Sequence, residues 1–121
     1  MDSKSSIAPW LSVNDGKRAL EFYKNAFGAT VVWQLDTPNQ SVVAKLSVNG
    51  AEFWIGDGND PQPLGGNSVR LILIVEDPDS MFARAINAGA TEVYPVSEAH
   101  GWRIGRLIDP FGLHWEIGYQ L

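Results

Sequence analysis

The chain of 121 residues contains no cysteine, only two histidines, and no apolar run long enough to cross a bilayer. Without cysteine, a disulfide framework, a thiolate nucleophile and a sulfur-based zinc site are all excluded. Any metal ion would have to be held by histidine and carboxylate side chains. Lysine and arginine form no cluster and the net charge is −5, so we expect neither a nucleic acid nor a membrane as partner.

The rest of the composition is ordinary for a soluble globular protein, with 45% apolar and 19% charged residues. At this length we expect a single domain spanning residues 1–121. The first six residues, MDSKSS, are not followed by the apolar segment of a secretory signal. The expected location is therefore the cytoplasm.

An internal repeat with an offset of 62 residues organises the sequence. VNDGKRALEFYKNAFGATVV matches VEDPDSMFARAINAGATEV, and NGAEFWIGD matches FGLHWEIGY further along each half. Each half has the pattern of a strand, a helix and three strands. We predict a first module over 7–57, a linker rich in glycine and proline over 58–68, and a second module over 69–119.

Capping residues and glycines delimit the helix predicted in each half. Asn14 or Asp15 can cap the first helix, which Gly28 ends, and Asp77 can cap the second, which Gly89 ends. The predicted strands cover 7–13, 30–35, 41–48, 51–56, 69–75, 92–96, 102–108 and 113–119. The predicted fold class is therefore α+β, with two tandem βαβββ modules.

These two modules, the helix stretch ALEFYKNAFGA and the final strand DPFG-x-HWEI together resemble the vicinal oxygen chelate superfamily. This superfamily contains glyoxalase I, bleomycin resistance proteins and extradiol dioxygenases, and the resemblance covers nearly the whole chain. It implies that each module curls its strands into an open, partly closed barrel-like mixed sheet around a concave face. It also implies one cleft built from two modules, within one chain or between two, and a homodimer.

In glyoxalase-type members, the first and last strands of each module supply the metal ligands. The resemblance and the repeat place these positions at Ala8, Trp54, Arg70 and Glu116. Alanine and tryptophan cannot ligate an ion, and a guanidinium has no lone pair to give. We therefore expect neither a metal nor a cofactor. We interpret Arg70 and Glu116 as an ion pair that replaces the ion's charge; the alternatives are a merely structural pair or no contact between the two side chains.

Strand alternation adds further candidates for ligand binding. Glu52 shares a strand face with Trp54, and His114 shares one with Glu116. Trp10 joins the concave face from the first strand of its module, whereas Trp115 faces the core. Such a face would offer tryptophan rings and titratable groups to a ligand.

A loop and the strand after it add two more candidates. Trp102 and Arg103 could stack on, or donate hydrogen bonds to, a planar or anionic ligand at the mouth of the cleft. Arg106 we interpret as an ordinary polar position of its strand. The ligand-binding set predicted from the sequence is Trp10, Glu52, Trp54, Arg70, Trp102, Arg103, His114 and Glu116.

Two functions remain open at this point. The first is a metal-independent protein that binds a small planar or cationic molecule, such as an antibiotic, in a tryptophan-lined cleft without altering it. The second is an enzyme, a lyase, isomerase or epimerase acting next to a carbonyl, either with a metal or with Glu116 as base and His114 or Arg70 stabilising the negative charge. His114 and Glu116 could also hold one ion weakly between them.

Overall fold

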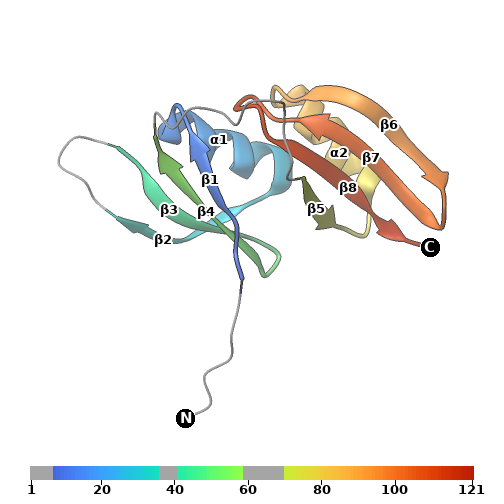
Figure 1. Cartoon of the computed structure of the whole chain (residues 1–121), viewed down its shortest axis with the longest axis horizontal. Helices are drawn as coiled ribbons and strands as arrows, with labels where there is room; N and C mark the ends of the chain where they lie inside the picture. The colour runs from blue at the N-terminus through green and yellow to red at the C-terminus, as the bar shows by residue number, and fades with distance from the viewer. Residues whose placement is uncertain (1–6, 36–40, 59–69) are drawn as a thin grey trace, which may run out of the picture.

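Two sheets, each backed by one helix, form the computed structural model of the chain, which describes residues 7–35, 41–58 and 70–121 (Figure 1). The elements are β1 (Trp10–Val13), α1 (Gly16–Phe27), β2 (Thr30–Leu35), β3 (Val43–Val48), β4 (Ala51–Asp57), β5 (Leu71–Ile74), α2 (Pro78–Asn87), β6 (Thr91–Ala99), β7 (Trp102–Ile108) and β8 (His114–Gln120). The strand orders are β1-β4-β3-β2 and β5-β8-β7-β6. This confirms the predicted fold class. The predicted linker lies, apart from Gly58, outside the described residues.

The repeat seen in the sequence is also a repeat of the backbone. In each module the first and last strands pair in parallel, and the other neighbouring strands pair in antiparallel fashion. Trp10 lies opposite Trp54 in one parallel pair, and Ile72 lies opposite Glu116 in the other. Both partners differ by 62 residues between the modules, so residues at this offset occupy equivalent places.

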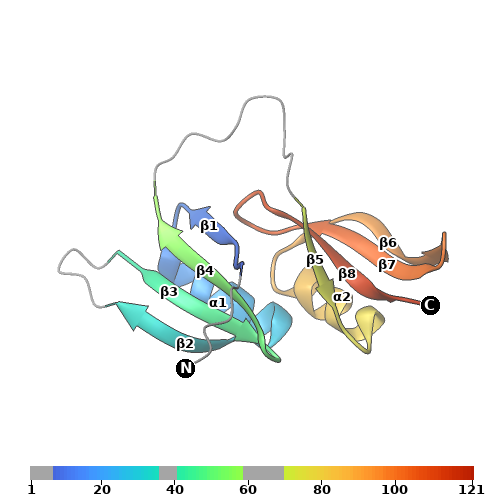
Figure 2. The ribbon, with the colours of Figure 1, turned by 60° about the horizontal axis from the view of Figure 1, so that its bottom comes forward.

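The helices begin as their capping residues predict. Asp15 accepts a hydrogen bond from the Arg18 N–H at 3.1 Å, and Gly28 ends α1 with a φ of 68°. Asp77 caps α2 in the same way, but the cap at the other end is Ala88 and not Gly89. The two helices lie behind their sheets and contact each other (Figure 2). Neither described helix is long and apolar enough to span a membrane.

The observed bounds of β1, β5 and β6 differ from the predicted ones. The outer strands β1 and β5 are shorter than predicted, with four residues each. β6 contains Pro95, as the predicted strand over 92–96 did, but it is longer and continues to Ala99. Its register shifts between Tyr94 and Ser97, and it lies at the edge of its sheet. An edge strand with such a shift tolerates a residue that cannot donate a ladder hydrogen bond.

A single buried carboxylate joins the two modules. Asp109, which is 3% exposed, lies between β7 and β8. Its Oδ1 accepts hydrogen bonds from the Phe111 and Leu113 N–H groups at 2.9 and 3.0 Å. Its Oδ2 accepts from the Tyr23 hydroxyl at 2.7 Å and from the Trp115 Nε1–H at 2.9 Å. Because Tyr23 belongs to α1, this carboxylate ties the helix of module one to the last hairpin of module two.

Aromatic rings enclose the network and keep water from it. The Tyr23 ring lies 5.2 Å from Phe53 and 5.9 Å from Trp115, measured between ring centroids. Trp115 is buried, as predicted. Burial raises the pKa of Asp109, although its four hydrogen bonds act in the opposite direction. Burial and the Asp109 charge also raise the pKa of Tyr23, so its hydroxyl stays protonated and donates.

We predict that Asp109→Asn lowers the free energy of unfolding by about 2–3 kcal/mol at neutral pH, because Tyr23 and Trp115 would meet an amide group instead of an accepting oxygen. Tyr23→Phe, which removes one donor only, should lower it by about 1 kcal/mol. Urea unfolding followed by far-UV circular dichroism measures both values. An unchanged unfolding midpoint for Asp109→Asn would contradict this role.

The destabilisation caused by Asp109→Asn should depend on pH, because Asp109 titrates. Since the pKa of Asp109 is raised on folding above its ordinary value of 3.8, the carboxyl contributes most stability below that pH and loses the contribution as the pH rises through the folded pKa. Asparagine does not titrate. The difference in unfolding free energy between the two proteins should therefore narrow as the pH rises from about 4 to about 7.

Candidate functional site

Each sheet carries one side chain from each of its four strands in a row across the face turned away from the helices. The module-one row is Trp33, Lys45, Trp54 and Trp10, and the module-two row is Tyr94, Arg106, Glu116 and Ile72. Members of a row are direct partners across neighbouring strands, so their side chains lie side by side. The residues alternating with them, such as Phe53 and Ile117, are buried on the helix side.

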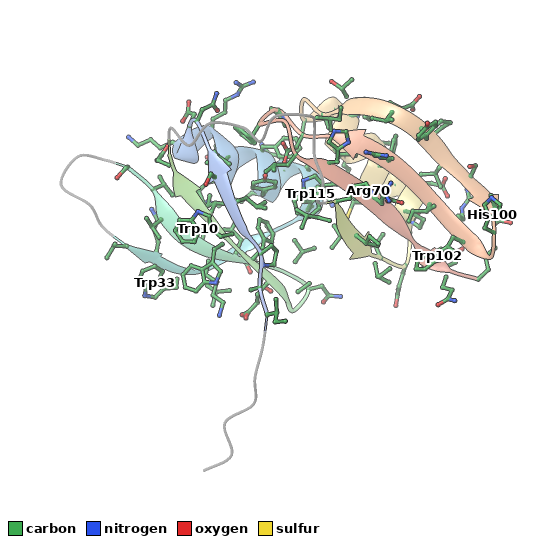
Figure 3. All side chains as sticks on the ribbon, in the orientation of Figure 1. Trp10, Trp33, Arg70, His100, Trp102 and Trp115 are labelled. Atoms are coloured by element: carbon green, nitrogen blue, oxygen red, sulfur yellow. The ribbon has the colours of Figure 1, made fainter. Side chains whose placement is uncertain are left out.

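The module-one row is an aromatic surface centred on Trp54. The Trp10 ring stacks on it, with centroids 6.3 Å apart and planes 20° apart, and the Trp33 ring meets it edge-on at 5.7 Å. The Lys45 ammonium lies 5.3 Å from the centre of the Trp54 ring. Trp10 and Trp33, both labelled in Figure 3, remain 53% and 45% exposed, so part of each ring is open to a ligand.

Gly56 lets the Trp10 ring lie against the sheet. A Cβ at this position would overlap the Trp10 indole, so any larger residue would displace the ring. Trp33 was not among the residues predicted from the sequence. Its place in the row depends on a register shift between Val31 and Trp33 in β2, which simple alternation along the strand does not reveal. The repeat offers a signal, because Trp33 aligns with Tyr94.

In module two, the expected ion pair is present. An Arg70 guanidinium nitrogen lies 3.3 Å from a Glu116 carboxylate oxygen. Glu116 is mostly covered, whereas about half of the Arg70 side chain is exposed. Arg70 directly precedes β5, and Ile72 on that strand is the cross-strand partner of Glu116 on β8.

Next to this pair, Arg106 and His114 are joined by hydrogen bonds. The Arg106 Nε and Nη2 groups lie 3.2 and 2.8 Å from the His114 Nδ1. Burial lowers the pKa of His114, and the charges of Arg106 and Arg70 lower it further. The ring is therefore neutral at neutral pH, with Nδ1 accepting from Arg106 and the proton on Nε2. The sequence analysis took Arg106 as an ordinary polar position of its strand and gave it no role.

Two further predicted residues do not join the rows. Trp102 begins β7 at the far end of module two, close to His100 and away from Trp10 and Trp33 (Figure 3). Within one chain it therefore lies on no common wall with those tryptophans. The prediction grouped them by residue type, and residue type carries no information on the distance along the sheet.

Arg103 faces the helix side of β7, because neighbouring strand residues point to opposite faces. Its guanidinium donates to the Asp79 carboxylate in the first turn of α2, with Nη2 at 2.7 Å and Nε at 3.0 Å from oxygen. A Glu98 oxygen lies 3.4 Å away on β6. Hydrogen bonding and these charges raise the pKa of Arg103. Its donors thus hold α2 against the sheet, and it does not open on the concave face as expected.

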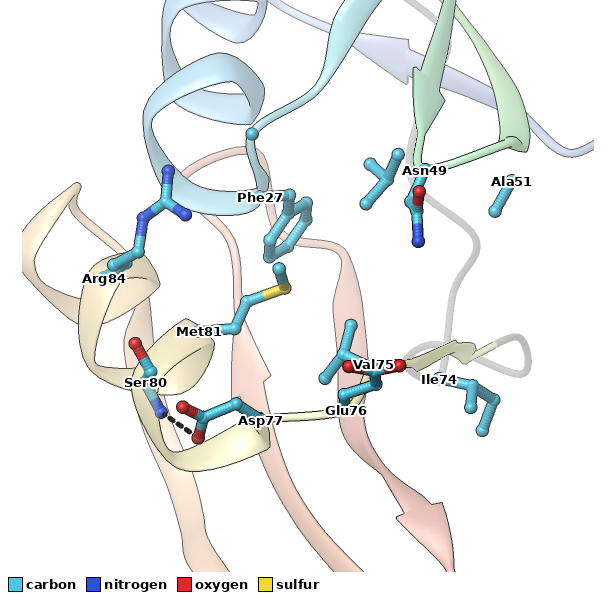
Figure 4. Close-up of a pocket in the computed structure, with 12 residues that line it drawn as sticks. Phe27, Asn49, Ala51, Ile74, Val75, Glu76, Asp77, Ser80, Met81 and Arg84 are labelled. Atoms are coloured by element: carbon cyan, nitrogen blue, oxygen red, sulfur yellow. Dashed lines mark hydrogen bonds between the residues drawn. The ribbon is translucent and has the colours of Figure 1, made fainter.

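Two cavities follow the seam between the modules. One of about 250 Å³ is lined by Glu52 from module one and by Arg70 and Ile72 from module two. The other, of about 410 Å³, lies where the end of α1 meets the start of α2 (Figure 4). Phe27 and Met81 form part of its lining, and the nearby Asp77 is engaged in capping α2. The first cavity lies between β4 of module one and β5 of module two.

The residues at the four metal-ligand positions of glyoxalase-type relatives do not fit a metal ion. Glu116 is the only carboxylate among them, and it already pairs with Arg70. Within residues 7–35, 41–58 and 70–121, no three histidine, aspartate or glutamate side chains lie close enough together to hold an ion. His114, the nearest additional ligand type, has its Nδ1 engaged by Arg106.

Comparison with known proteins adds a family. The family model described as a glyoxalase-like domain matches residues 10–117, a span that includes both rows. An uncharacterized protein of Mycobacterium bovis is 36% identical over 124 aligned positions, covering 93% of this chain and 82% of the relative.

Solved structures share the fold. A gene product from Arabidopsis thaliana is 29% identical with a TM-score of 0.74, covering 97% of this chain and 100% of the other. The fosfomycin resistance protein FosX from Listeria monocytogenes has a TM-score of 0.80 at 18% identity, covering 100% of this chain and 96% of the other.

Proposed function

The chain belongs to the glyoxalase-like domain family, and we propose that it binds a small planar molecule against the tryptophans of its first module without a metal ion. The observation that carries this proposal is the group formed by Trp10, Trp33 and Trp54. These rings contact each other in a fixed arrangement, yet two of them keep about half of their surface exposed. Contiguous exposed aromatic surface of this kind is typical of binding sites.

A planar ligand suits this surface better than a simple cation. Lys45 and Glu52 lie 3.1 Å apart and neutralise each other beside the tryptophans. On the concave face of module two, the two cations Arg70 and Arg106 lie beside one carboxylate of the row, that of Glu116. A flat ring can stack on Trp10 or Trp54, and each such contact contributes about 0.5–1.5 kcal/mol beyond the area that it buries.

We propose that the ligand is held without being altered. Proton abstraction would need a free base, but Glu116 is paired with Arg70 and His114 accepts from Arg106. Some antibiotics are planar molecules. FosX, which shares this fold, is a fosfomycin resistance protein, so the fold is found in a protein that acts in antibiotic resistance. Sequestration of an antibiotic is the specific form that we propose for this chain.

Tryptophan fluorescence tests the binding surface. Bleomycin or mitomycin C should quench the emission saturably at micromolar concentration and be recovered unchanged. Trp54→Ala should weaken binding about tenfold or more, because it removes the central ring that Trp10 stacks on and that Trp33 meets edge-on. Tyr119→Leu, on the opposite face of β8, should bind as the unaltered chain does. If neither drug nor any other flat aromatic probe quenches, the planar-ligand proposal is wrong.

Metal independence has its own test. The chain purified without chelator should contain nickel, zinc and iron only in substoichiometric amounts by elemental analysis. Adding these ions should raise Tm by less than about 1 °C, because Arg70 occupies the place of an ion beside Glu116. A stoichiometric metal content together with a clear rise in Tm would overturn this part of the proposal.

We further propose that two copies pair, so that the module-one row of one copy faces the module-two row of the other. The support is exposed apolar surface on the concave faces, where Trp10, Ile72 and Ile74 are 53%, 57% and 58% exposed. In a two-fold symmetric dimer, the same contacts occur twice, so the exposed apolar surface of both copies is buried. It would also close the concave faces into an enclosed site.

Sedimentation velocity at micromolar concentration should show twice the mass of the chain. Ile74→Lys should shift the protein to the monomer, since it would place a charge in the covered surface. Leu121→Lys adds the same charge to an exposed apolar residue at the chain end and should leave the dimer intact. A monomer at all concentrations in the unaltered chain would contradict the pairing.

A further inference from the structure

Arg106 differs from the other cations of the two concave faces in its partner. Lys45 pairs with Glu52, and Arg70 pairs with Glu116. Arg106 donates to the Nδ1 of His114, and no acidic side chain in the described parts of the chain forms an ion pair with it. Its charge is therefore not balanced by a salt bridge there.

The internal repeat allows Arg106 of module two to be compared with Lys45 of module one. Lys45 and Arg106 occupy the same row position of β3 and β7, opposite Trp54 and Glu116. Glu52 and His114 precede those partners by two residues and lie on the same face. The two cations thus contact residues at equivalent places, Glu52 in module one and His114 in module two. The backbone pattern is the same, but Lys45 has an anionic partner and Arg106 does not.

The geometry of Arg106 suits an incoming carboxylate. A guanidinium has five N–H donors, of which Nε and Nη2 use one each on His114. The remaining donors include the Nη1 pair, and they can bind both oxygens of a planar anion. Because His114 already fixes the guanidinium plane, little side-chain freedom is lost when an anion binds. Glu116 beside it has its charge compensated by Arg70, which limits repulsion of the anion.

We propose that Arg106, oriented by His114, binds a carboxylate group of the small-molecule ligand. The inference rests on the proposed function, because it names the charged group of that same ligand. Arg106 is the binding residue, and His114 is a positioning residue that acts through it. The ligand class is thus a planar aromatic carboxylate, with the ring for the tryptophan surface and the anion for Arg106.

The test uses benzoate and its neutral analogue benzamide. In ¹H–¹⁵N spectra of the full chain, benzoate should shift the Arg106 Nε–H signal saturably at millimolar concentration, and benzamide should leave that signal in place. Arg106→Gln identifies the signal and should abolish the binding. Arg18→Gln, which removes the same charge from the exposed surface of α1, should bind benzoate as the unaltered chain does.

His114 is tested by two substitutions. His114→Glu gives module two the acid that module one has, and it should weaken benzoate binding about tenfold while the fold is retained. His114→Gln keeps an accepting oxygen for Arg106 and should retain most of the affinity. If both variants bind benzoate equally well, the positioning role is wrong.

The outcomes separate this inference from the proposed function. Equal binding of benzoate and benzamide, or benzoate binding that survives Arg106→Gln, overturns the carboxylate site even where flat drugs still quench the tryptophans. A response to inorganic phosphate without one to benzoate also overturns it, because the site would then prefer another anion. Benzoate binding at Arg106 with no quenching by any flat probe would instead remove the tryptophan surface from the proposed function.

Discussion

The buried carboxylate of Asp109 is the constraint on which the rest of the structure depends. Four donors from both modules converge on it, including the Tyr23 hydroxyl of α1 and the Trp115 indole of β8. Since a buried anion is tolerated only with its partners in place, the two modules must sit at one mutual angle. That fixed angle brings Glu52 of module one and Arg70 of module two to the same cavity.

Duplication has preserved the backbone while the side chains of the two rows have diverged. Module one presents three tryptophans, and module two presents a guanidinium, an ion pair and an isoleucine at the matching places. The four positions that the resemblance assigns to metal ligands contain one carboxylate, Glu116, and Arg70 forms an ion pair with it. The structure therefore combines an aromatic face with a cationic one, which suits a ligand that is both flat and anionic.

Periodicity and the repeat were enough to predict the modules, the helix caps other than the C-cap of α2, the buried Trp115 and the Arg70–Glu116 pair. They missed Trp33 because a register shift in β2 sets its direction. Arg106 received no role because its hydrogen bonds go to His114 on the neighbouring strand. Such a contact between strands cannot be read from residue spacing along the sequence. Trp102 and Arg103 were grouped with the tryptophans by residue type, although Arg103 points to the helix side and bonds to Asp79. Distance along a sheet follows only from the assembled fold.

A crystal structure with naphthalene-2-carboxylate bound tests the central claim most directly. The account predicts a ring stacked on Trp10 or Trp54, with both carboxylate oxygens within hydrogen-bond distance of the Arg106 guanidinium, the two rows coming from two copies of the chain. A ligand seated in the seam cavity beside Phe27 and Met81, or a carboxylate directed away from Arg106, would contradict it.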